Sequence, residues 1–384
     1  MSIAALDMAV LPEAAEALRP GIRALVARET ASMTLPERSR SWMGYSAAFS
    51  RTLASGGYLG LTLPVEYGGR GLGPFARFVV VEELLQVGAP VAAHWIADRQ
   101  SAPLLLKFGS EEQKRRYIPA ICRGELYFSI GMSEPNAGSD LSAVRSRAER
   151  QYDGSWLLNG QKIWTSGAHL NHYMIALVRT SGGADSRHAG LSQFIVDLAA
   201  PGVSIRPIPD LNGDNDFNEI FFDNVALPAD SLVGEEGEGW AQVNAELAFE
   251  RSGPERIYSS IVLLDAWIAH LGQVRANDAR IAKVGGLMAQ LAALRQMSIA
   301  VTALLEAGDS PAVEASLVKD LGTGFEQSIP ALIADDLASH PDEAVSGELM
   351  TTLKLVTHIA PSFSLRGGTR EILRGIIARG LGLR

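Results

Sequence analysis

The sequence predicts an α+β protein in which a helical region, a β region and a second helical region follow one another. Helical periodicity with loop interruptions covers residues 14–123, strand signals separated by turn residues fill residues 127–234, and helical periodicity returns from Gly239. Because helices and sheets each bury one face, this order favours two helical domains flanking a small β domain. We therefore expect three domains, at residues 1–125, 126–236 and 237–384.

Local signals support the helical regions. The stretch Ser110-Glu111-Glu112-Gln113 is a capping box, which predicts a helix beginning there. In the C-terminal region, apolar residues recur at steps of three and four, which places them on one face of a helix. These residues are Ile257, Ile261, Leu264, Ile268 and Leu271. Loops are expected near residues 307–311 and 339–342.

The β region shows turn chemistry between short apolar runs. Residues 156–158 and 162–164 flank Asn159-Gly160, a dipeptide typical of tight hairpin turns, so we expect a hairpin there. Further strands are expected at residues 172–180, 191–198, 203–209 and 218–223.

The composition excludes several classes of function. The net charge is −9, whereas a surface that binds nucleic acid needs a basic stripe to neutralise phosphates. The single cysteine, Cys122, excludes a disulfide framework, and the seven histidines show no metal-ligand spacing, so we expect no metal. No uninterrupted apolar run reaches the roughly 18 residues that span a bilayer, and residues 1–20 lack signal-peptide features. We therefore expect a cytoplasmic protein that binds neither nucleic acid nor membrane.

Two short stretches carry the residue types of a ligand site. Residues 127–142 read YFSIGMSEPNAGSDLS, in which a strand-like run leads into small residues. Small residues let a backbone approach a ligand closely, and the N–H groups of such a turn suit phosphate. Residues 159–167 read NGQKIWTSG and offer a flat ring followed by two hydroxyls. On their own, these stretches are also explained by a tight loop and by a hairpin with one buried tryptophan.

Together the two stretches resemble the acyl-CoA dehydrogenase family, whose β domain carries a TEPxAGSD loop and an NGxKxWITNG hairpin. Further phrases similar to this family occur in the family's order: LPVEYGGRG (63–71), FGSEEQKRRYIPAICRGE (108–125), FNEIFFDNVALPADSLVGEEGEGW (217–240) and GGTREILRGIIARGLG (367–382). The resemblance covers most of the chain. It implies an N-terminal helical domain, a central β-barrel-like domain and a C-terminal four-helix bundle, with acyl-CoA dehydrogenase activity.

The resemblance also implies FAD as the cofactor. Residues 130–133 would line the edge of the flavin ring, Trp164 would pack on the ring, and Thr165 and Ser166 would bond near its N5 and ribityl region. The family usually has Thr where this chain has Ser166, so the hydroxyl is kept. The residues expected to contact FAD are Ile130, Met132, Ser133, Gly138, Ser139, Trp164, Thr165, Ser166, Thr369 and Glu371.

One departure from the family decides the expected general base. Most members read Tyr-Glu-Gly-Thr near the C-terminus, and that Glu is the base, but here Gly367 stands at its position. A minority, similar to isovaleryl-CoA dehydrogenase, carries the base on the helix that opens the C-terminal domain, where this chain has Glu250. An α proton beside a thioester is weakly acidic, so a carboxylate must be positioned to take it. Without the resemblance, Glu250 is better explained as a solvated charge on a helix surface, paired with neighbouring residues.

The resemblance places the thioester near the same motifs. We expect substrate contacts from Ser139, Gly367 and Gly368, and Arg251 would contact the CoA portion or orient the adjoining loop. The substrate would be an acyl-CoA, and an electron-transfer flavoprotein would accept the electrons. A dehydrogenase of carrier-protein thioesters and an acyl-CoA oxidase are related alternatives.

A second departure concerns the adenine half of FAD. Family homotetramers usually hold it with an Arg-x-x-Phe-Gly motif and a Gln-x-x-Gly-Gly motif from a neighbouring subunit. Residues 271–286 lack the first phrase, and no glycine occurs between Gly347 and Gly367 where the second belongs. This pattern is similar to heteromeric members, so we expect a homo- or hetero-oligomer, typically a tetramer. A non-catalytic partner subunit is the alternative in another functional class.

Overall fold

The structure is a computed structural model that describes residues 6–183, 186–274 and 276–383, without the side chains of residues 246–250. These residues form two compact units. The first unit consists of segments within Met1–Gly44, Leu72–Val91 and Ala248–Arg384, and the second of segments within Tyr45–Gly71 and Ala92–Leu247. The predicted α+β class is confirmed, while the three expected sequence domains remain a prediction.

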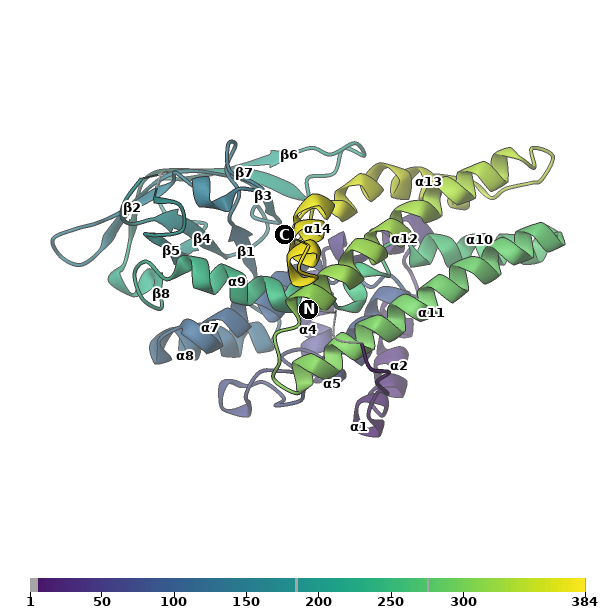
Figure 1. The fold of residues 1–384 in the computed structure, drawn as a ribbon, viewed down its shortest axis with the longest axis horizontal. Helices are drawn as coiled ribbons and strands as arrows, with labels where there is room; N and C mark the ends of the chain where they lie inside the picture. Colours follow the sequence, from purple (N-terminus) through teal and green to yellow (C-terminus); the bar gives the residue numbers. More distant parts are fainter. Residues whose placement is uncertain (1–5, 184–185, 275, 384) are drawn as a thin grey trace. The chain divides into compact units, whose positions relative to one another are not determined.

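The helices and strands follow the order helical, β, helical (Figure 1). The α-helices are α1 (Glu13–Glu16), α2 (Arg19–Glu29), α3 (Leu35–Ser39), α4 (Ala47–Ser55), α5 (Pro74–Gln86), α6 (Ala92–Ile96), α7 (Ala102–Phe108), α8 (Glu111–Cys122), α9 (Gly239–Glu250), α10 (Ile261–Val274), α11 (Asp278–Glu306), α12 (Ala312–Ala338), α13 (Gly347–Ile359) and α14 (Arg370–Gly380). The strands are β1 (Phe128–Gly131), β2 (Arg147–Arg150), β3 (Trp156–Ser166), β4 (Tyr173–Arg179), β5 (Leu191–Asp197), β6 (Val203–Ile208), β7 (Phe217–Leu227) and β8 (Leu232–Val233).

Short helical turns connect these elements. They are η1 (Ser41–Met43), η2 (Val65–Tyr67), the π-helical turn η3 (Ala97–Ser101), η4 (Leu141–Ala143), η6 (Ala229–Ser231), η7 (Pro254–Arg256) and η8 (Ala360–Ser364). The expected capping box is confirmed, because the Ser110 side chain accepts the Gln113 N–H and the Gln113 side chain accepts the Ser110 N–H. The loops expected near residues 307–311 and 339–342 are confirmed, since α11 ends at Glu306 and α12 ends at Ala338.

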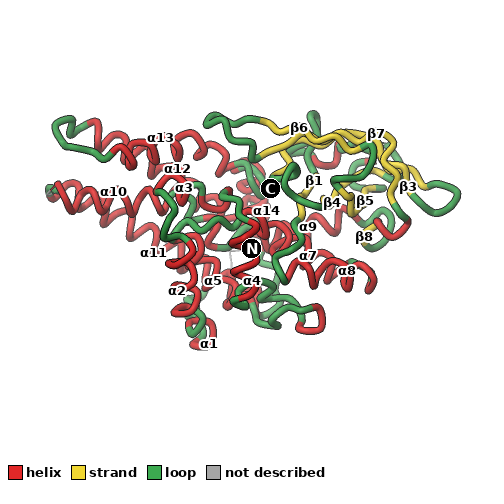
Figure 2. Tube along the Cα trace, turned by 180° about the vertical axis from the view of Figure 1, so that it is seen from behind, coloured by secondary structure: helices red, strands yellow, loops and turns green. Residues whose placement is uncertain are grey.

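The second unit is built on one mixed sheet, drawn in yellow in Figure 2. Its strand order is β6-β7-β3-β2-β4-β5-β8, and β1 pairs with β4. The β1–β4 and β2–β4 pairings are parallel and the other pairings are antiparallel. The strands expected at residues 172–180, 191–198, 203–209 and 218–223 are confirmed as β4, β5, β6 and β7.

Strand β4 explains why the sheet carries two apolar cores. Alternate side chains of a strand point to opposite faces. Met174, Ala176 and Val178 join a core between strands, whereas Ile175 packs in the core that includes α7 and α8, and Leu177 packs in a cluster with α9. Both faces of β4 are therefore covered, which is why its sequence is continuously apolar instead of alternating.

The hairpin expected around Asn159-Gly160 was wrong, because both residues lie inside the single long strand β3. The register of β3 against β7 shifts between Leu158 and Gly160, so the dipeptide forms an irregularity within the strand. Gly160 has φ 141°, and a Cβ there would lie 2.3 Å from Ser146 Oγ. A close approach of Ser146 from outside the local sequence therefore decides the structure at this glycine.

Helices α10–α13 of the first unit pack on one another, with α12 also packing against α14 (Figure 1). The apolar stripe expected at 257–271 is confirmed for its last four residues, which lie on α10. Ile257 lies before that helix, at the end of η7, because Gly253-Pro254 interrupts the helical path after Glu250. Ile257 is still buried, at 1% exposure.

Helix α11 is long and apolar enough to cross a membrane, judged by its length and composition alone. Of its most apolar 18-residue stretch, 44% is buried inside the protein, and the helix packs against α12 and α5. Polar side chains such as Gln290 and Arg295 interrupt it, in agreement with the absence of an uninterrupted apolar run. A core helix of a globular unit has these same properties.

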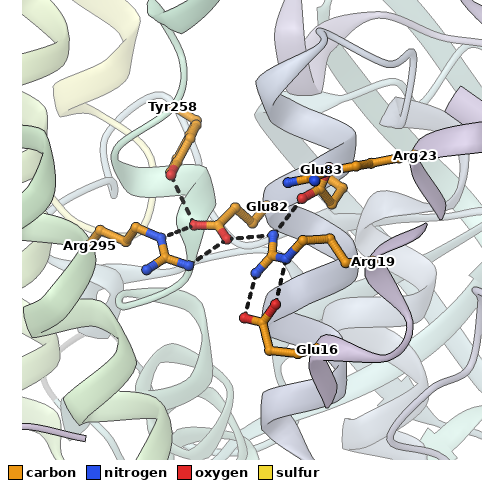
Figure 3. A network of polar contacts seen from close by, with 7 residues as sticks. All are labelled: Glu16, Arg19, Arg23, Glu82, Glu83, Tyr258 and Arg295. Carbon is orange, nitrogen blue, oxygen red and sulfur yellow. Dashed lines mark hydrogen bonds and ion pairs between the residues drawn. The ribbon is translucent and has the colours of Figure 1, made fainter. Parts of the chain in front are cut away.

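An ion-pair network around two buried carboxylates of α5 connects α1, α2 and α11 with Tyr258, which follows η7, within the first unit (Figure 3). Glu82 lies at its centre, with a side chain 4% exposed. It accepts hydrogen bonds from Arg295 Nε at 2.6 Å, Arg19 Nη1 at 3.0 Å and the Tyr258 hydroxyl at 2.9 Å. The neighbouring Glu83 is bonded by Arg19 and Arg23. Every carboxylate oxygen of Glu82 thus has a donor, as burial of a charge requires.

This environment sets the ionisation of Glu82. Burial by itself raises the pKa of the Glu82 carboxyl, but the hydrogen bonds and charge of Arg295, with the bonds of Tyr258 and Arg19, outweigh burial and lower the pKa below its usual 4.5. Because the pKa is lower in the folded state, the ionised network stabilises the protein above the unfolded pKa. That stabilisation is lost as the pH falls through the folded pKa.

We predict that Glu82→Gln lowers the free energy of unfolding at pH 7 by about 1.5–3 kcal/mol, because it removes the carboxylate that bonds Arg295 and that shares Arg19 with Glu16 and Glu83. Urea titration would measure this. Arg28→Gln, which breaks the exposed pair with Glu29, should cost at most about 1 kcal/mol. The difference in the free energy of unfolding between the wild type and Glu82→Gln should become smaller as the pH falls below 4.5. Equal losses for both variants would contradict this assignment.

Candidate functional site

The expected site residues fall into two groups, one in each unit. The second unit contains the expected site residues between positions 130 and 139 and at positions 164–166. The first unit contains those at positions 250, 251, 367–369 and 371. Each group has a local geometry of its own.

In the second unit, the end of β1 lies beside the second half of β3. The Ser129 hydroxyl donates to the Ser166 carbonyl at 2.8 Å, and the Ile163 N–H donates to the Ser133 carbonyl at 2.9 Å. Residues 130–133 and 164–166 were singled out from two separate sequence motifs. The structure brings these motifs together, with Ile130, Met132, Ser133 and Ser166 partly buried.

A bulge in β3 gives Trp164 an unusual direction. Lys162 pairs with Ile220 and Thr165 pairs with Asn218, so two residues of β3 lie opposite one residue of β7. Trp164 is one of those two and has φ 60°, a left-handed conformation that is uncommon for a bulky residue. Its side chain is 58% exposed. The bulge therefore presents a flat aromatic ring at the surface, which local strand propensity alone does not favour.

Thr165, the next residue, is buried with an unsatisfied hydroxyl. It is 1% exposed, and its Oγ1 has no hydrogen-bond partner within the described residues. Its carbonyl, in contrast, accepts a bond from Asn218 Nδ2 at 3.0 Å. A buried hydroxyl without a partner is costly unless a ligand completes it. An exposed ring beside an unsatisfied hydroxyl fits a planar heterocycle with hydrogen-bonding edges, as the flavin of FAD has.

Lys162 belongs to the second sequence motif, but the sequence assigned it no role. The structure shows that its ammonium is buried and bonded. Its side chain is 0% exposed, and its Nζ lies 2.8 Å from Glu134 Oε1 and 3.2 Å from the Met132 carbonyl. Burial lowers the pKa of Lys162 to about 8, although the charge of Glu134 opposes this. Burial raises the pKa of Glu134, but the charge and hydrogen bond of Lys162, with hydrogen bonds from Ser146 and from the Arg145 backbone, outweigh burial and lower this pKa.

The loop after Glu134 turns tightly and then becomes exposed. Glu134 and Ala137 exchange backbone hydrogen bonds of 2.8 and 3.0 Å. Gly138 and Ser139, the expected pyrophosphate and thioester positions, are exposed, and a Cβ at Gly138 would meet no atom within 4 Å. No internal contact therefore demands glycine there. Among the described residues, no group of three or more His, Cys, Asp or Glu could hold a metal ion.

In the first unit, two buried cations hold the Gly367-Gly368 turn. Both glycines have positive φ, at 66° and 100°, which favours glycine over other residues. Arg251 Nε donates to the Gly367 carbonyl at 3.0 Å, and Lys319 Nζ donates to the Gly368 carbonyl at 2.7 Å. Arg251 was expected from the sequence. Lys319 was missed, because a single lysine in the apolar pattern of α12 carries no local signal of its partner.

Thr369 and Glu371 open α14. Thr369 is the N-cap, and its hydroxyl accepts the Ile372 N–H at 3.5 Å, so part of its bonding capacity serves the helix. Glu371 is exposed in the first turn, where its own backbone N–H and the Thr369 hydroxyl lower the pKa of its carboxyl. Acidic residues are favoured at this position by the helix dipole.

Glu250, the expected general base, is the last residue of α9. Its side chain lies outside the described residues, so its direction stays a prediction. Arg251 follows it directly and is 6% exposed.

Comparisons with known proteins agree with these observations. Residues 12–125 match the family described as acyl-CoA dehydrogenase, N-terminal domain, and residues 129–225 match acyl-CoA dehydrogenase, middle domain. The chain is similar to acyl-CoA dehydrogenase IpdE1 of Mycobacterium tuberculosis, with 36% identity over 361 residues, which cover 91% of this chain and 90% of that protein.

Two solved structures are similar over nearly the whole chain. A steroid ACAD, Tcur3481-Tcur3483, has a TM-score of 0.84 and 27% identity, covering 97% of this chain and 98% of that chain. The ChsE4-ChsE5 complex from Mycobacterium tuberculosis has a TM-score of 0.81 and 28% identity, covering 97% of this chain and 98% of that chain. These likenesses confirm the fold that the sequence motifs implied.

We predict that Thr165→Val leaves the stability of the FAD-free protein unchanged or slightly higher, because the hydroxyl makes no bond within the described residues. The same change should weaken FAD binding by up to roughly tenfold, the worth of one lost hydrogen bond. Flavin fluorescence titration would measure this. Thr180→Val is the matched control, since Thr180 Oγ1 lies 2.9 Å from Ser192 Oγ. Thr180→Val should lower the stability of the protein and leave FAD affinity unchanged. A Thr165→Val variant that loses stability and keeps FAD affinity would contradict the assignment.

Proposed function

The chain belongs to the acyl-CoA dehydrogenase family, and on that premise we propose that it oxidises an acyl-CoA thioester between Cα and Cβ with FAD as its cofactor. The cofactor assignment rests on one observation, which is that the end of β1 lies beside the bulge of β3. There the Trp164 ring is exposed and the Thr165 hydroxyl is buried without a partner in the described residues. When bound, FAD supplies the acceptor for the hydride that leaves Cβ.

We propose that Glu250 takes the α proton. The family position that usually carries the base is Gly367 in this chain, and a glycine has no proton acceptor in its side chain. The thioester makes the α proton acidic only when the developing enolate oxygen receives hydrogen bonds, so a carboxylate and donors must act together. The substrate then loses a proton from Cα and a hydride from Cβ, and the product is the 2-enoyl-CoA.

The Gly367-Gly368 turn supports this assignment by its structure. Its left-handed backbone would strain a residue with a side chain, and its two carbonyls are already held by Arg251 and Lys319. We propose that this turn contributes backbone and space near the thioester, while Arg251 fixes the turn directly after the base in the sequence. The resemblance also assigns a contact with the thioester ligand to Ser139, which is exposed.

We predict that Glu250→Gln slows flavin bleaching by an acyl-CoA by roughly 10²–10⁴-fold, the usual contribution of a positioned general base. FAD content and stability should stay at wild-type levels. Rapid mixing with straight-chain, branched and ring-bearing acyl-CoAs would first identify the substrate and then test the variant. Glu246→Gln, one helical turn earlier, is the control and should bleach at the wild-type rate. Wild-type bleaching by Glu250→Gln would overturn the assignment of the base.

We also propose that the physiological form is an oligomer that pairs this chain with a related, unlike chain. Residues 271–286 lack the Arg-x-x-Phe-Gly motif that usually lends adenine contacts to a neighbour. The similar ChsE4-ChsE5 structure is itself a complex of two named proteins. Electrons would leave through an electron-transfer flavoprotein. A partner subunit without turnover is the second candidate, which the missing adenine motifs favour.

We predict that the chain purified alone binds less than one FAD per chain, and that co-expression with a neighbouring homologue restores both occupancy and bleaching. The absorbance ratio of flavin to protein, with the mass of the assembly by light scattering, measures this. A homotetramer with full FAD and high activity would contradict the pairing and leave the role of Glu250 untouched. Full FAD without bleaching by any acyl-CoA would favour the partner subunit. Oxygen consumption coupled to product would identify an oxidase.

A further inference from the structure

The three residues that follow β1 and precede the turn, Met132 to Glu134, are bonded by two consecutive residues of β3. Lys162 Nζ donates to the Met132 carbonyl at 3.2 Å, and the Ile163 N–H donates to the Ser133 carbonyl at 2.9 Å. Lys162 Nζ also donates to Glu134 Oε1 at 2.8 Å. We refer to these contacts as the 132–134 clasp. They lie at the point where β3 bulges outward to expose Trp164.

Glu134 extends the clasp to the rest of the loop. Its Oε2 accepts the Arg145 N–H at 2.7 Å, and its Oε1 accepts the Ser146 N–H at 2.9 Å. Its backbone closes the turn to Ala137. One buried carboxylate therefore joins both ends of the loop that contains Gly138 and Ser139, and its charge is balanced by the Lys162 ammonium.

The clasp goes beyond what sheet pairing requires. A lysine on a strand normally points its ammonium to solvent, because burial of a charge is costly unless the charge is paired and hydrogen-bonded. The Lys162 side chain is 0% exposed, and one of the three N–H groups of its ammonium donates to a backbone carbonyl. An apolar pair would stabilise the sheet as well or better. What the ammonium adds is a fixed position for the Met132 carbonyl, and with it the peptide plane that Met132 shares with Ser133.

We propose that Lys162 is a positioning residue that sets the backbone of Met132 and Ser133 at the flavin edge, relative to Trp164 and Thr165. This inference rests on the proposed function. Lys162 acts through the Met132 carbonyl and does not itself touch the ring or the substrate. The Glu134 carboxylate has a different task, which is to keep the ammonium charged and buried in place.

Three variants distinguish the bond to the Met132 carbonyl from the balance of charge between Lys162 and Glu134. Lys162→Met removes both the charge and the bond to the Met132 carbonyl. Glu134→Gln removes the charge partner and leaves that bond. The double variant Lys162→Met/Glu134→Gln removes the bond and leaves no unpaired buried charge.

Each variant is made in the full chain, with the partner homologue if FAD binding needs it. FAD affinity is measured by fluorescence titration, and stability by urea titration of the FAD-free protein. Lys162→Met and the double variant should both bind FAD roughly 10–100-fold more weakly, the loss expected for a hydrogen bond from a charged group. Glu134→Gln should lose stability, but its amide oxygen can still accept the N–H groups that close the loop, so FAD affinity should stay within about threefold. The double variant should regain stability relative to Lys162→Met without regaining affinity.

A purely structural ion pair gives the opposite pattern. FAD affinity would then follow stability, so both single variants would bind weakly and the double variant would recover. That result would overturn the proposal. Phe194→Leu, a buried change in β5 away from the clasp, is the control for general loosening of the sheet and should leave FAD affinity unchanged. If Lys162→Met does not fold, the double variant and Glu134→Gln still give opposite predictions.

A second readout needs no FAD. In the FAD-free protein, amide hydrogen exchange of residues 130–137 should become faster in Lys162→Met and in the double variant, while β4 and β5 keep wild-type exchange. Unchanged exchange at 130–137 in both variants would contradict the positioning role. If the wild-type chain, alone and co-expressed, binds no FAD, the proposed function fails, and the exchange measurement still decides whether Lys162 holds this backbone.

Discussion

The register of strand β3 is the constraint on which the candidate site depends. Its backbone pairs with β7 along almost its whole length, and it shifts register twice, after Leu158 and after Lys162. The second shift turns Trp164 outward and leaves the Thr165 hydroxyl buried. Because side chains alternate along a strand, one residue more or less before the bulge would exchange the buried and exposed positions of Lys162, Trp164 and Thr165. The chemistry of the site therefore follows from strand pairing before any ligand binds.

Buried cations that bond to backbone carbonyls recur at the motifs that the family resemblance selects. Lys162 holds the Met132 carbonyl in the second unit, and Arg251 and Lys319 hold the Gly367-Gly368 turn in the first. Lys162 also pairs with the Glu134 carboxylate. The Glu82 network in Figure 3 differs, since the bonds drawn there join side chains of several helices and none goes to a backbone carbonyl. The first arrangement fixes a short backbone segment, whereas the second fastens secondary-structure elements together. This difference is the reason that we propose a positioning role for Lys162 beside its ion pair with Glu134.

Much of the fold was predictable from local patterns, and the failures have a common physical cause. The Ser110 capping box, the strands β4–β7 and the loops between the C-terminal helices depend on residues close in sequence, and all were confirmed. The Asn159-Gly160 hairpin was wrong because Ser146, from outside that stretch, determines the conformation at Gly160. The roles of Lys162 and Lys319 were likewise missed, because each depends on a carbonyl distant in sequence. The motifs could nominate candidate site residues, but only the fold could show which side chains hold their backbone in place.

The most direct test of this account is amide hydrogen exchange of the wild-type chain with and without FAD. If the β1 end and the β3 bulge form the flavin edge, residues 128–137 and 161–166 should become protected together when FAD binds, while β6 should exchange at an unchanged rate. Protection of only one of the two segments would separate motifs that the structure brings together. Saturating FAD that protects neither segment would contradict the placement of the cofactor.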